Sequence, residues 1–258
     1  MSFTLVTFIE WFSGFFWAVI RVGGFVMTVP IFGNQLISPR IKIALSAAIA
    51  LAISPTLTAM PLLTSFGVDT IVQVMVQLLS GIGLGFATVI FFQLFVVAGQ
   101  FVGMQMGLGF ASMVDPGNGI TVTVWSQFFL MLVTLTFISM NGHLVLLEVL
   151  IEGFKASPTG VTVELKEMVW SIAALGGWMF SGGILIALPA VMSLLIVNVA
   201  FGIMSRSAPQ LNIFSLGFPF SLLFGLVIIW VLISQWEQRF TVIGEEFFRF
   251  TRLWSGAA

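Results

Sequence analysis

The stretch TIVQVMVQLLSGIGLGFATVIFFQLFVVAGQFVGMQMGLGFASMV, residues 70–114, contains 45 consecutive residues without a charged side chain. As a single α-helix it would be about 68 Å long, more than twice the thickness of the hydrocarbon core of a bilayer. We therefore expect the helix to break after Gly99, where further glycines accumulate. Asp115-Pro116-Gly117-Asn118-Gly119 follows, and Pro and Gly at these positions are typical of a tight turn. Residues from about 107 to 120 are thus predicted to form a glycine-rich loop between two long apolar helices.

Charged residues mark the ends of the other apolar segments, because an ionised side chain in hydrocarbon costs several kcal/mol. Four more charge-free intervals exceed the roughly 20 residues that a helix needs to cross a bilayer: 43–68, 116–147, 168–205 and 207–236. A sixth apolar stretch covers about residues 3–29. Hydrophobic residues make up 59% of the chain and charged residues 7%, against about 25% charged in soluble domains. The sequence therefore predicts an all-α membrane protein with six apolar segments in one compact helical domain.

The C-terminal third predicts a helical hairpin followed by an amphipathic helix. Residues 168–205 are too long for one straight span and contain Pro189, which would kink the helix. The next apolar run, 211–236, is expected to return antiparallel after a turn at about 205–210. In 237–254 one helical face is apolar and the opposite face is charged. The two faces consist of Phe240, Ile243, Phe247, Phe250 and Trp254, and of Glu245, Glu246, Arg249 and Arg252. Such a helix suits an interface or the groove of a partner.

Charge, cysteine and histidine content exclude several classes of function. The net charge is −1 and the nine Lys and Arg residues are scattered, so we expect no nucleic acid as a partner. The absence of Cys excludes disulfides and thiolate metal sites, and the lone His143 cannot build a His-rich metal site. No arrangement of nucleophile and base surrounds His143. We therefore predict no enzymatic activity, no cofactor and no metal.

Polar residues inside the apolar segments need partners. Glu10 and Arg21 lie eleven residues apart and so project from nearly the same helical face. Either this face meets a partner subunit, or each residue is satisfied within the chain. Gln73 and Gln77 share a face at i and i+4, which indicates a polar seam between helices. Packing within the chain explains this seam as well as a position facing a lumen does.

Small and flexible residues precede and border the predicted loop. Gly99-x-x-x-Gly103-x-x-x-Gly107 places glycines on one helical face, which permits close packing within the chain or with another subunit. Methionine and phenylalanine residues surround the loop: Phe101, Met104, Met106, Phe110 and Met113. Such side chains can form a deformable seal or simply fill a core. Their place beside a long loop with a single acid, Asp115, favours the seal.

Short motifs occur in a fixed order between about residues 21 and 219. They are Arg21-x-Gly23, Pro30-Ile31-Phe32-Gly33, Pro39-Arg40-Ile41-Lys42, Gly103-Met104-Gln105-Met106-Gly107, Asp115-Pro116, Asn141-Gly142-His143, Phe154, Pro158, Gly160, Ala187-Leu188-Pro189, Asn198, Ala208-Pro209-Gln210-Leu211-Asn212-Ile213-Phe214 and Gly217-Phe218-Pro219. Taken together, this ordered set resembles the FliR/SctT family of the type III secretion export apparatus. Asn141-Gly142-His143 and Asp115-Pro116 are more similar to the flagellar branch than to the injectisome branch.

The resemblance implies a core subunit of the flagellar type III protein export gate in the bacterial inner membrane and flagellar basal body. Such a subunit would form a closed helical core with FliP and FliQ, contact FlhB, lie beside FlhA, touch membrane lipid and pass unfolded flagellar export substrates. Much of the assembled core would lie on the periplasmic side. The resemblance also divides the chain into a FliP-like part, a FliQ-like helical hairpin and an amphipathic tail, at residues 1–160, 161–236 and 237–258.

In that family the central loop plugs the lumen, and it maps by position onto about residues 106–119. The plug and gasket residues expected here are Met104, Met106, Gly107, Gly109, Phe110, Met113, Asp115, Pro116, Gly117 and Gly119. For packing against other subunits we expect Glu10, Arg21, Gly99 and Gly103. An apolar seal of this kind can bar water and ions because a hydrophobic constriction dewets.

Three other functions fit parts of the pattern. The injectisome counterpart, SctT, shares many of the motifs. A small-solute secondary transporter would also be a multi-helix membrane protein, but it predicts inverted repeats around a midplane site, and the sequence contains no convincing inverted repeat. A purely structural scaffold of the assembly would lack any part facing a lumen. The export-gate subunit is the reading that accounts for the ordered motifs and the glycine-rich segment together.

Overall fold

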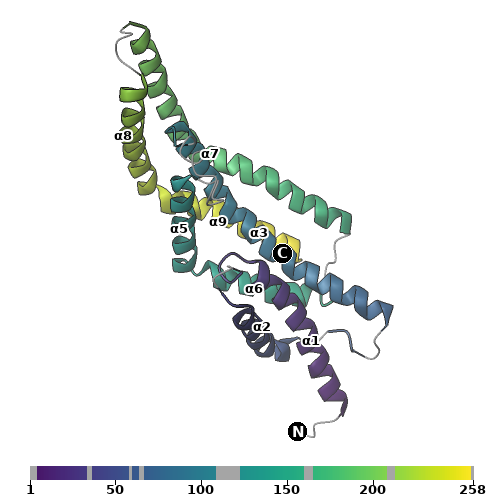
Figure 1. Cartoon of the computed structure of the whole chain (residues 1–258). Coiled ribbons are helices and arrows are strands. Elements are labelled where there is room, and N and C mark those ends of the chain that lie inside the picture. Colours follow the sequence, from purple (N-terminus) through teal and green to yellow (C-terminus); the bar gives the residue numbers. More distant parts are fainter. Residues whose placement is uncertain are drawn as a thin grey trace. The chain divides into compact units, whose positions relative to one another are not determined.

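The computed structural model describes residues 5–33, 37–57, 60–63, 67–108, 123–159, 165–207 and 213–256. Within these ranges every regular element is a helix, as Figure 1 shows. The elements are α1 Leu5–Thr28, α2 Pro39–Ile53, the 3₁₀ turn η1 Ser54–Thr56, α3 Val68–Gln105, α5 Val124–Ser139, α6 Gly142–Ala156, α7 Leu165–Ser207, α8 Ile213–Ser234 and α9 Trp236–Ser255. The predicted all-α fold class is confirmed.

Four of the described helices are long and apolar enough to cross a membrane. They cover Thr7–Thr28, Val68–Gln105, Trp170–Ser207 and Gly217–Ser234. Helices α5 and α6 reach the required length only as a pair, bent by 67° at the break between them. The six apolar segments predicted from the sequence therefore do not all become spanning helices: in the part of the chain that the structure describes, four helices are long and apolar enough to cross a membrane, or five if the bent pair counts as one.

Helix α2 is too short to span, although it begins the charge-free interval 43–68. It has 15 residues and ends at Ile53, where Ser54-Pro55-Thr56 form a single 3₁₀ turn. Proline cannot donate a backbone hydrogen bond and its ring clashes with the preceding helical turn, so Pro55 favours the end of the helix at this point. The absence of charged residues predicts which segments can lie in hydrocarbon. It does not predict where the helix ends, which here depends on Pro55.

The interval 116–147 is divided by Asn141. This residue has φ 58°, in the left-handed region that Asn adopts more readily than most residues. Its N–H donates to the carbonyl of Ile138, and its own carbonyl accepts from the N–H groups of Leu144 and Val145. It thus ends α5 and begins α6 in a new direction. The dipeptide Asn141-Gly142 is a turn signal that identifies this break in the sequence.

The chain divides into two compact units, where the sequence suggests one. The first unit comprises Met1–Ile90, Ile138–Leu175 and Glu246–Ala258, and the second comprises Phe91–Phe137 and Gly176–Glu245. Each unit draws on stretches that are far apart in the sequence, so α3, α7 and α9 each contribute residues to both. The division at residues 160 and 236 that the family resemblance implies stays a prediction.

In the first unit, α1 and α3 approach closely through glycines. A Cβ atom at Gly24 would lie 2.8 Å from the carbonyl oxygen of Leu78, and one at Gly81 would collide with the carbonyl oxygen of Arg21. A Cβ atom at Gly85 would collide with the hydroxyl of Thr28. Small residues allow such close contact between helix backbones. Gly81-x-x-x-Gly85 therefore packs within the chain.

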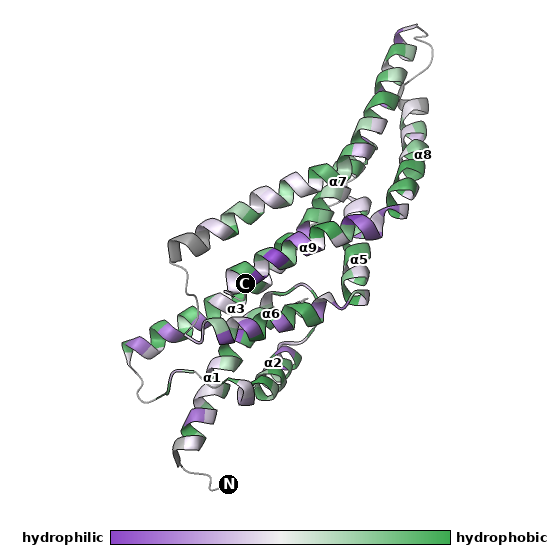
Figure 2. Cartoon of the chain, turned by 180° about the vertical axis from the view of Figure 1, so that it is seen from behind, coloured by the Kyte–Doolittle hydropathy of each residue, from purple (hydrophilic) through white to green (hydrophobic). Residues whose placement is uncertain are grey.

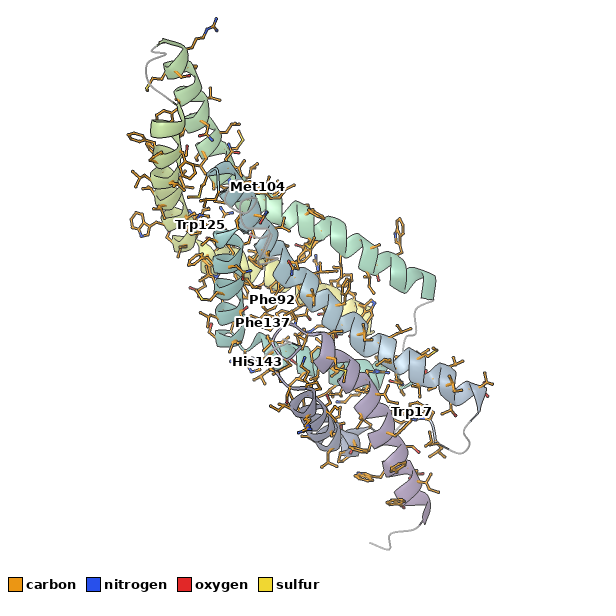
Figure 3. The ribbon with its side chains drawn as sticks, in the orientation of Figure 1. Trp17, Phe92, Met104, Trp125, Phe137 and His143 are labelled. Carbon is orange, nitrogen blue, oxygen red and sulfur yellow. The ribbon has the colours of Figure 1, made fainter. Side chains whose placement is uncertain are left out.

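In the second unit, an aromatic core joins α3, α5 and α9. Its rings are those of Phe91, Phe92, Phe95, Phe129, Phe137, Trp236 and Phe240, with neighbouring centroids 5.2–5.9 Å apart. Figure 3 shows Phe92 and Phe137 within this core. Trp236 Nε1 also donates to Thr136 Oγ1 at 2.9 Å. Helix α9 confirms the predicted amphipathic helix, but Phe240 and Phe247 are buried within the chain rather than presented to a partner.

Helices α7 and α8 form the predicted hairpin. Ser221 Oγ donates to Asn198 Oδ1 at 2.8 Å, and the rings of Phe201 and Phe220 lie 5.5 Å apart. Residue numbers rise on one helix as they fall on the other, so the pair is antiparallel. Helix α7 has 43 residues with Pro189 inside it, and Figure 2 shows it changing direction along its length. The missing N–H and the ring of proline account for such a bend.

Candidate functional site

The C-terminal end of α3 is closed by a glycine turn. Gly107 has φ 81°, its N–H donates to the carbonyl of Met104 at 3.0 Å, and the N–H of Leu108 donates to the carbonyl of Gly103 at 3.0 Å. This pair of hydrogen bonds around a left-handed glycine is the Schellman motif. The break therefore lies near the predicted start of the loop at about residue 107, and not directly after Gly99, because the helix continues to Gln105. A helical glycine costs only about 1 kcal/mol relative to alanine, and packing offsets that cost here.

The packing partner of these glycines is the start of α5. A Cβ atom at Gly99 would lie 2.7 Å from the carbonyl oxygen of Trp125, and one at Gly103 would lie 2.7 Å from Thr123 Oγ1. Thr123 N and Ser126 Oγ both donate to Gln100 Oε1, at 3.2 and 3.0 Å. The structure thus places Gly99 and Gly103 against the same chain, which is one of the two alternatives that the sequence left open.

The α7–α8 hairpin also contacts the end of α3 and its glycine turn. Asn198 Nδ2 donates to the carbonyl of Gln105 at 3.3 Å. A Cβ atom at Gly107 would lie 3.1 Å from the ring of Phe218, and one at Gly225 would collide with the side chain of Met106. Residues 105–107 therefore contact both helices of the hairpin: Gln105 contacts α7, and Met106 and Gly107 contact α8.

The predicted plug residues divide into described and undescribed ones. Met104 is 58% exposed, whereas Met106 is 1% exposed and fills the core of its own unit. Figure 3 shows Met104 at the end of α3, with Trp125 of α5 nearby. The remaining predicted plug residues lie outside the described residues: Gly109, Phe110, Met113, Asp115, Pro116, Gly117 and Gly119. The two positions that flank them, Leu108 and Thr123, both belong to the anchored region around Gly103.

A second polar site surrounds Arg21 in the first unit. Its Nε donates to Gln77 Oε1 at 2.7 Å and its Nη2 donates to the carbonyl of Ser157 at 2.8 Å. The guanidinium carbon lies 4.0 Å from the centre of the Phe154 ring, a favourable cation–π distance. Gln77 Nε2 in turn donates to the carbonyl of Pro158 at 2.8 Å. The arginine is thus satisfied by amide groups and a ring.

This network decides between the alternatives for the polar residues of α1 and α3. Arg21 is 3% exposed and finds its partners in its own chain. Glu10, one of the residues predicted for subunit packing, is exposed. Gln73 Nε2 donates to the carbonyl of Thr159, so Gln73 and Gln77 form the predicted polar seam within the chain. Sequence reasoning missed the acceptors at 157–159, which the Ser157-Pro158 turn signal could have indicated.

The hairpin leaves much of its apolar surface uncovered in the single chain. Of the spanning windows, the one in α7 is 22% buried and the one in α8 is 28% buried, against 67% in α3. Ile196 is 69% exposed and Trp230 is 75% exposed. Figure 2 shows that both helices are hydrophobic over most of their length. Lipid or other protein chains must cover these faces, because so large an apolar surface is unfavourable in water.

Among the described residues, no three His, Cys, Asp or Glu side chains are grouped so as to hold a metal ion.

Comparison with known proteins identifies the family. Residues 12–247 match the family model of the bacterial export proteins, family 1. The chain is 35% identical over 228 residues to the flagellar biosynthetic protein FliR of Escherichia coli, covering 88% of this chain and 86% of that protein. It is 33% identical to FliR of Pectobacterium carotovorum over 90% and 89% of the two chains, and 26% identical to FliR of Bacillus subtilis over 88% of each. The chain therefore belongs to the FliR family of bacterial export proteins.

Proposed function

We propose that the chain is a core subunit of the flagellar type III protein export gate and forms part of the wall and plug of its protein-conducting channel. Family membership and the relatives' printed name, flagellar biosynthetic protein FliR, support the export role and favour the flagellar over the injectisome branch. The spanning helices suit the inner membrane at the flagellar basal body. The role is that of a structural component of a channel rather than of an enzyme.

The uncovered hairpin supports assembly with other subunits. The exposed faces of α7 and α8 include large side chains such as Leu185, Ile196 and Trp230. Apolar helix faces of this size are typical of contacts between subunits or with lipid. We infer that FliP and FliQ cover part of this surface in a closed helical core, that FlhB contacts the core, and that FlhA lies beside it. Much of the assembled core would then stand on the periplasmic side of the membrane.

The observation that supports a plug is that both ends of the glycine-rich segment are anchored to the rest of the chain. Leu108 is fixed by the Schellman turn and Thr123 by Gly99, Gly103 and Gln100. Within the described part of α3, Gln93 and Met104 are exposed and lie eleven residues apart, on nearly the same helical face. This face carries both a polar and a flexible apolar side chain, as a lumen-facing wall requires. Residues 106–119 would close the lumen until an unfolded export substrate arrives.

The plug is tested by deleting residues 109–119. This deletion retains the Schellman turn at 106–108 and the anchor at Thr123, whose close contact with Gly103 leaves only a short gap for residues 120–122 to bridge. Ion conductance of the inner membrane should rise, measured in cells whose assembled complex is quantified in parallel. The matched control is Gly202→Ala, because a Cβ atom at this position meets nothing within 4 Å. A fully assembled complex with unchanged conductance would show that the segment is not a plug.

A solute transporter predicts a different outcome from the gate in a simpler measurement. The purified transporter should be stable as a single chain, whereas a gate subunit with the exposed faces of α7 and α8 should need its partners. The large uncovered surface favours the gate.

A further inference from the structure

The last carbonyl groups of α3 have no partners within the helix, as at every helix C-terminus. The carbonyl of Val102 accepts from the N–H of Met106, and the Schellman turn satisfies Gly103 and Met104. The carbonyl of Gln105, the final helical residue, has its described partner outside the helix. That partner is Asn198 Nδ2 on α7, at 3.3 Å. The hairpin thus supplies the hydrogen bond that the end of α3 lacks.

Asn198 uses both ends of its amide for this junction. While Nδ2 donates to Gln105, Oδ1 accepts from Ser221 Oγ of α8 at 2.8 Å. Ser221 is only 5% exposed, so its hydroxyl has little access to solvent. The carbonyl of Gln105 fixes which way the amide points, because it can only accept, and a flipped amide would place an oxygen against it. The hydroxyl of Ser221 then donates to Oδ1. One side chain therefore joins three helices.

Two apolar contacts lie on either side of this hydrogen-bonded chain. Met106 packs so closely on Gly225 of α8 that a Cβ atom there would collide with its side chain. Gly107 faces the ring of Phe218, also on α8. Polar and apolar contacts together restrain residues 105–107 on the hairpin. All these residues belong to one compact unit.

We propose that Asn198 is a positioning residue that couples the α7–α8 hairpin to the terminal turn of α3. The hairpin carries the exposed faces that neighbouring subunits would cover, and the turn is the stem of the segment proposed as the plug. If neighbouring subunits move the hairpin, Asn198 therefore transmits this movement to the terminal turn of α3. This inference rests on the proposed function for its consequence in the channel, but the junction itself is testable without it.

The test uses the absence of Cys from the chain. Met106→Cys with Gly225→Cys places a thiol pair at the close contact, with no other thiol in the chain to compete. In the assembled complex this pair should form a disulfide rapidly on mild oxidation. Adding Asn198→Leu removes donor and acceptor together. Disulfide formation should slow about tenfold, the factor expected from loss of the one hydrogen bond that joins the hairpin to Gln105. The matched control is Ser193→Ala, because Ser193 is an exposed α7 residue whose hydroxyl donates to the carbonyl of Pro189 in its own helix.

A second measurement separates positioning from simple stability. Asn198→Leu in the chain without added cysteines should raise ion leak severalfold while leaving the amount of assembled complex unchanged, which a general loss of stability would not do. Equal disulfide rates in the presence and absence of Asn198→Leu would overturn the proposal. If deletion of residues 109–119 does raise the leak, an unchanged leak with Asn198→Leu in fully assembled complex would overturn it as well.

Two further variants keep the test decisive. If Asn198→Leu does not accumulate, Ser221→Ala serves instead: it frees the amide to rotate and should slow the disulfide about threefold, while an unchanged rate counts against the coupling. Asn198→Asp retains the acceptor for Ser221 but loses the donor to Gln105, so it should resemble Asn198→Leu. If the complex lacks FliP and FliQ, the proposed function fails, yet the disulfide rates still decide whether Asn198 joins the hairpin to α3.

Discussion

Arg21 and Gln77 are joined by a hydrogen bond of 2.7 Å across 56 positions of sequence, and this bond links α1 to α3 in the first unit. The same guanidinium bonds to the carbonyl of Ser157 and stacks on Phe154, so a single buried cation connects three parts of the chain. Arginine is suited to this because its planar fork presents several donors in fixed directions and stacks on aromatic rings.

Replacing Arg21 by methionine should destabilise the first unit. The variant leaves Gln77 Oε1 and the carbonyl of Ser157 without their donor in a buried site, at a cost of about 1–3 kcal/mol for each group. Thermal unfolding of the purified complex should therefore begin at a lower temperature. Arg206→Met is the matched control, because Arg206 is exposed at the end of α7. Equal unfolding temperatures for the two variants would mean that the network contributes nothing to stability.

Two adjacent glycines of α1 should respond in opposite ways to alanine. A Cβ atom at Gly24 would lie 2.8 Å from the carbonyl oxygen of Leu78, a backbone atom that cannot move aside cheaply, whereas one at Gly23 meets nothing within 4 Å. Gly24→Ala should lower stability by about 1–3 kcal/mol. Gly23→Ala should be neutral or stabilise by up to about 1 kcal/mol through helix propensity. Denaturation of the two variants side by side measures this, and a similar loss for both would contradict the close approach of α1 and α3.

Substitution of Gly107 should loosen the end of α3. Its φ of 81° is left-handed, which costs a residue with a side chain about 1–2 kcal/mol, and the ring of Phe218 limits the space. Gly107→Ala should therefore increase protease cleavage near this turn in the assembled complex, whereas Gly202→Ala, at an open position of α7, should not. Unchanged protection in Gly107→Ala would show that the turn does not depend on its glycine.

Removing exposed apolar side chains from the hairpin should weaken assembly without unfolding the chain. Trp230→Ala and Ile196→Ala truncate side chains that are 75% and 69% exposed, so little packing within the chain is lost. Affinity purification should recover less FliP and FliQ with these variants, since large apolar side chains dominate such interfaces. Arg249→Ala, on the exposed polar side of α9, is the control. Full recovery of both partners would place the interface elsewhere.

The sequence predicts the elements that depend on local pattern. The amphipathic spacing of 237–254 identifies α9, and the apolar runs on either side of residues 205–210 identify the hairpin of α7 and α8. The helix ends predicted from the sequence are wrong where a helix ends for a reason other than a charged residue. Pro55 ends α2 early, Asn141 bends the segment of α5 and α6, and α3 continues past Gly99 because the start of α5 packs on its glycines.

The partners of the candidate site residues depend on the tertiary fold, which periodicity does not contain. The spacing of Gln73 and Gln77 indicates a polar seam, but nothing local shows that Arg21 and the carbonyls of 157–159 complete it. The helical spacing of Gly99 and Gly103 likewise indicates a close contact without naming its partner. Asn198, which joins α3 to the hairpin, is one of the ordered motifs and a polar residue in an apolar helix, but the sequence does not show what it contacts.

The most direct test of the gate assignment is mass spectrometry of the intact complex purified through a tag on this chain from its native membrane. FliP and FliQ should be recovered with the chain in a fixed ratio, because we propose that they cover the exposed faces of α7 and α8. Recovery of the chain as a stable monomer or homodimer, free of both subunits, would contradict the proposal that it forms part of the export channel.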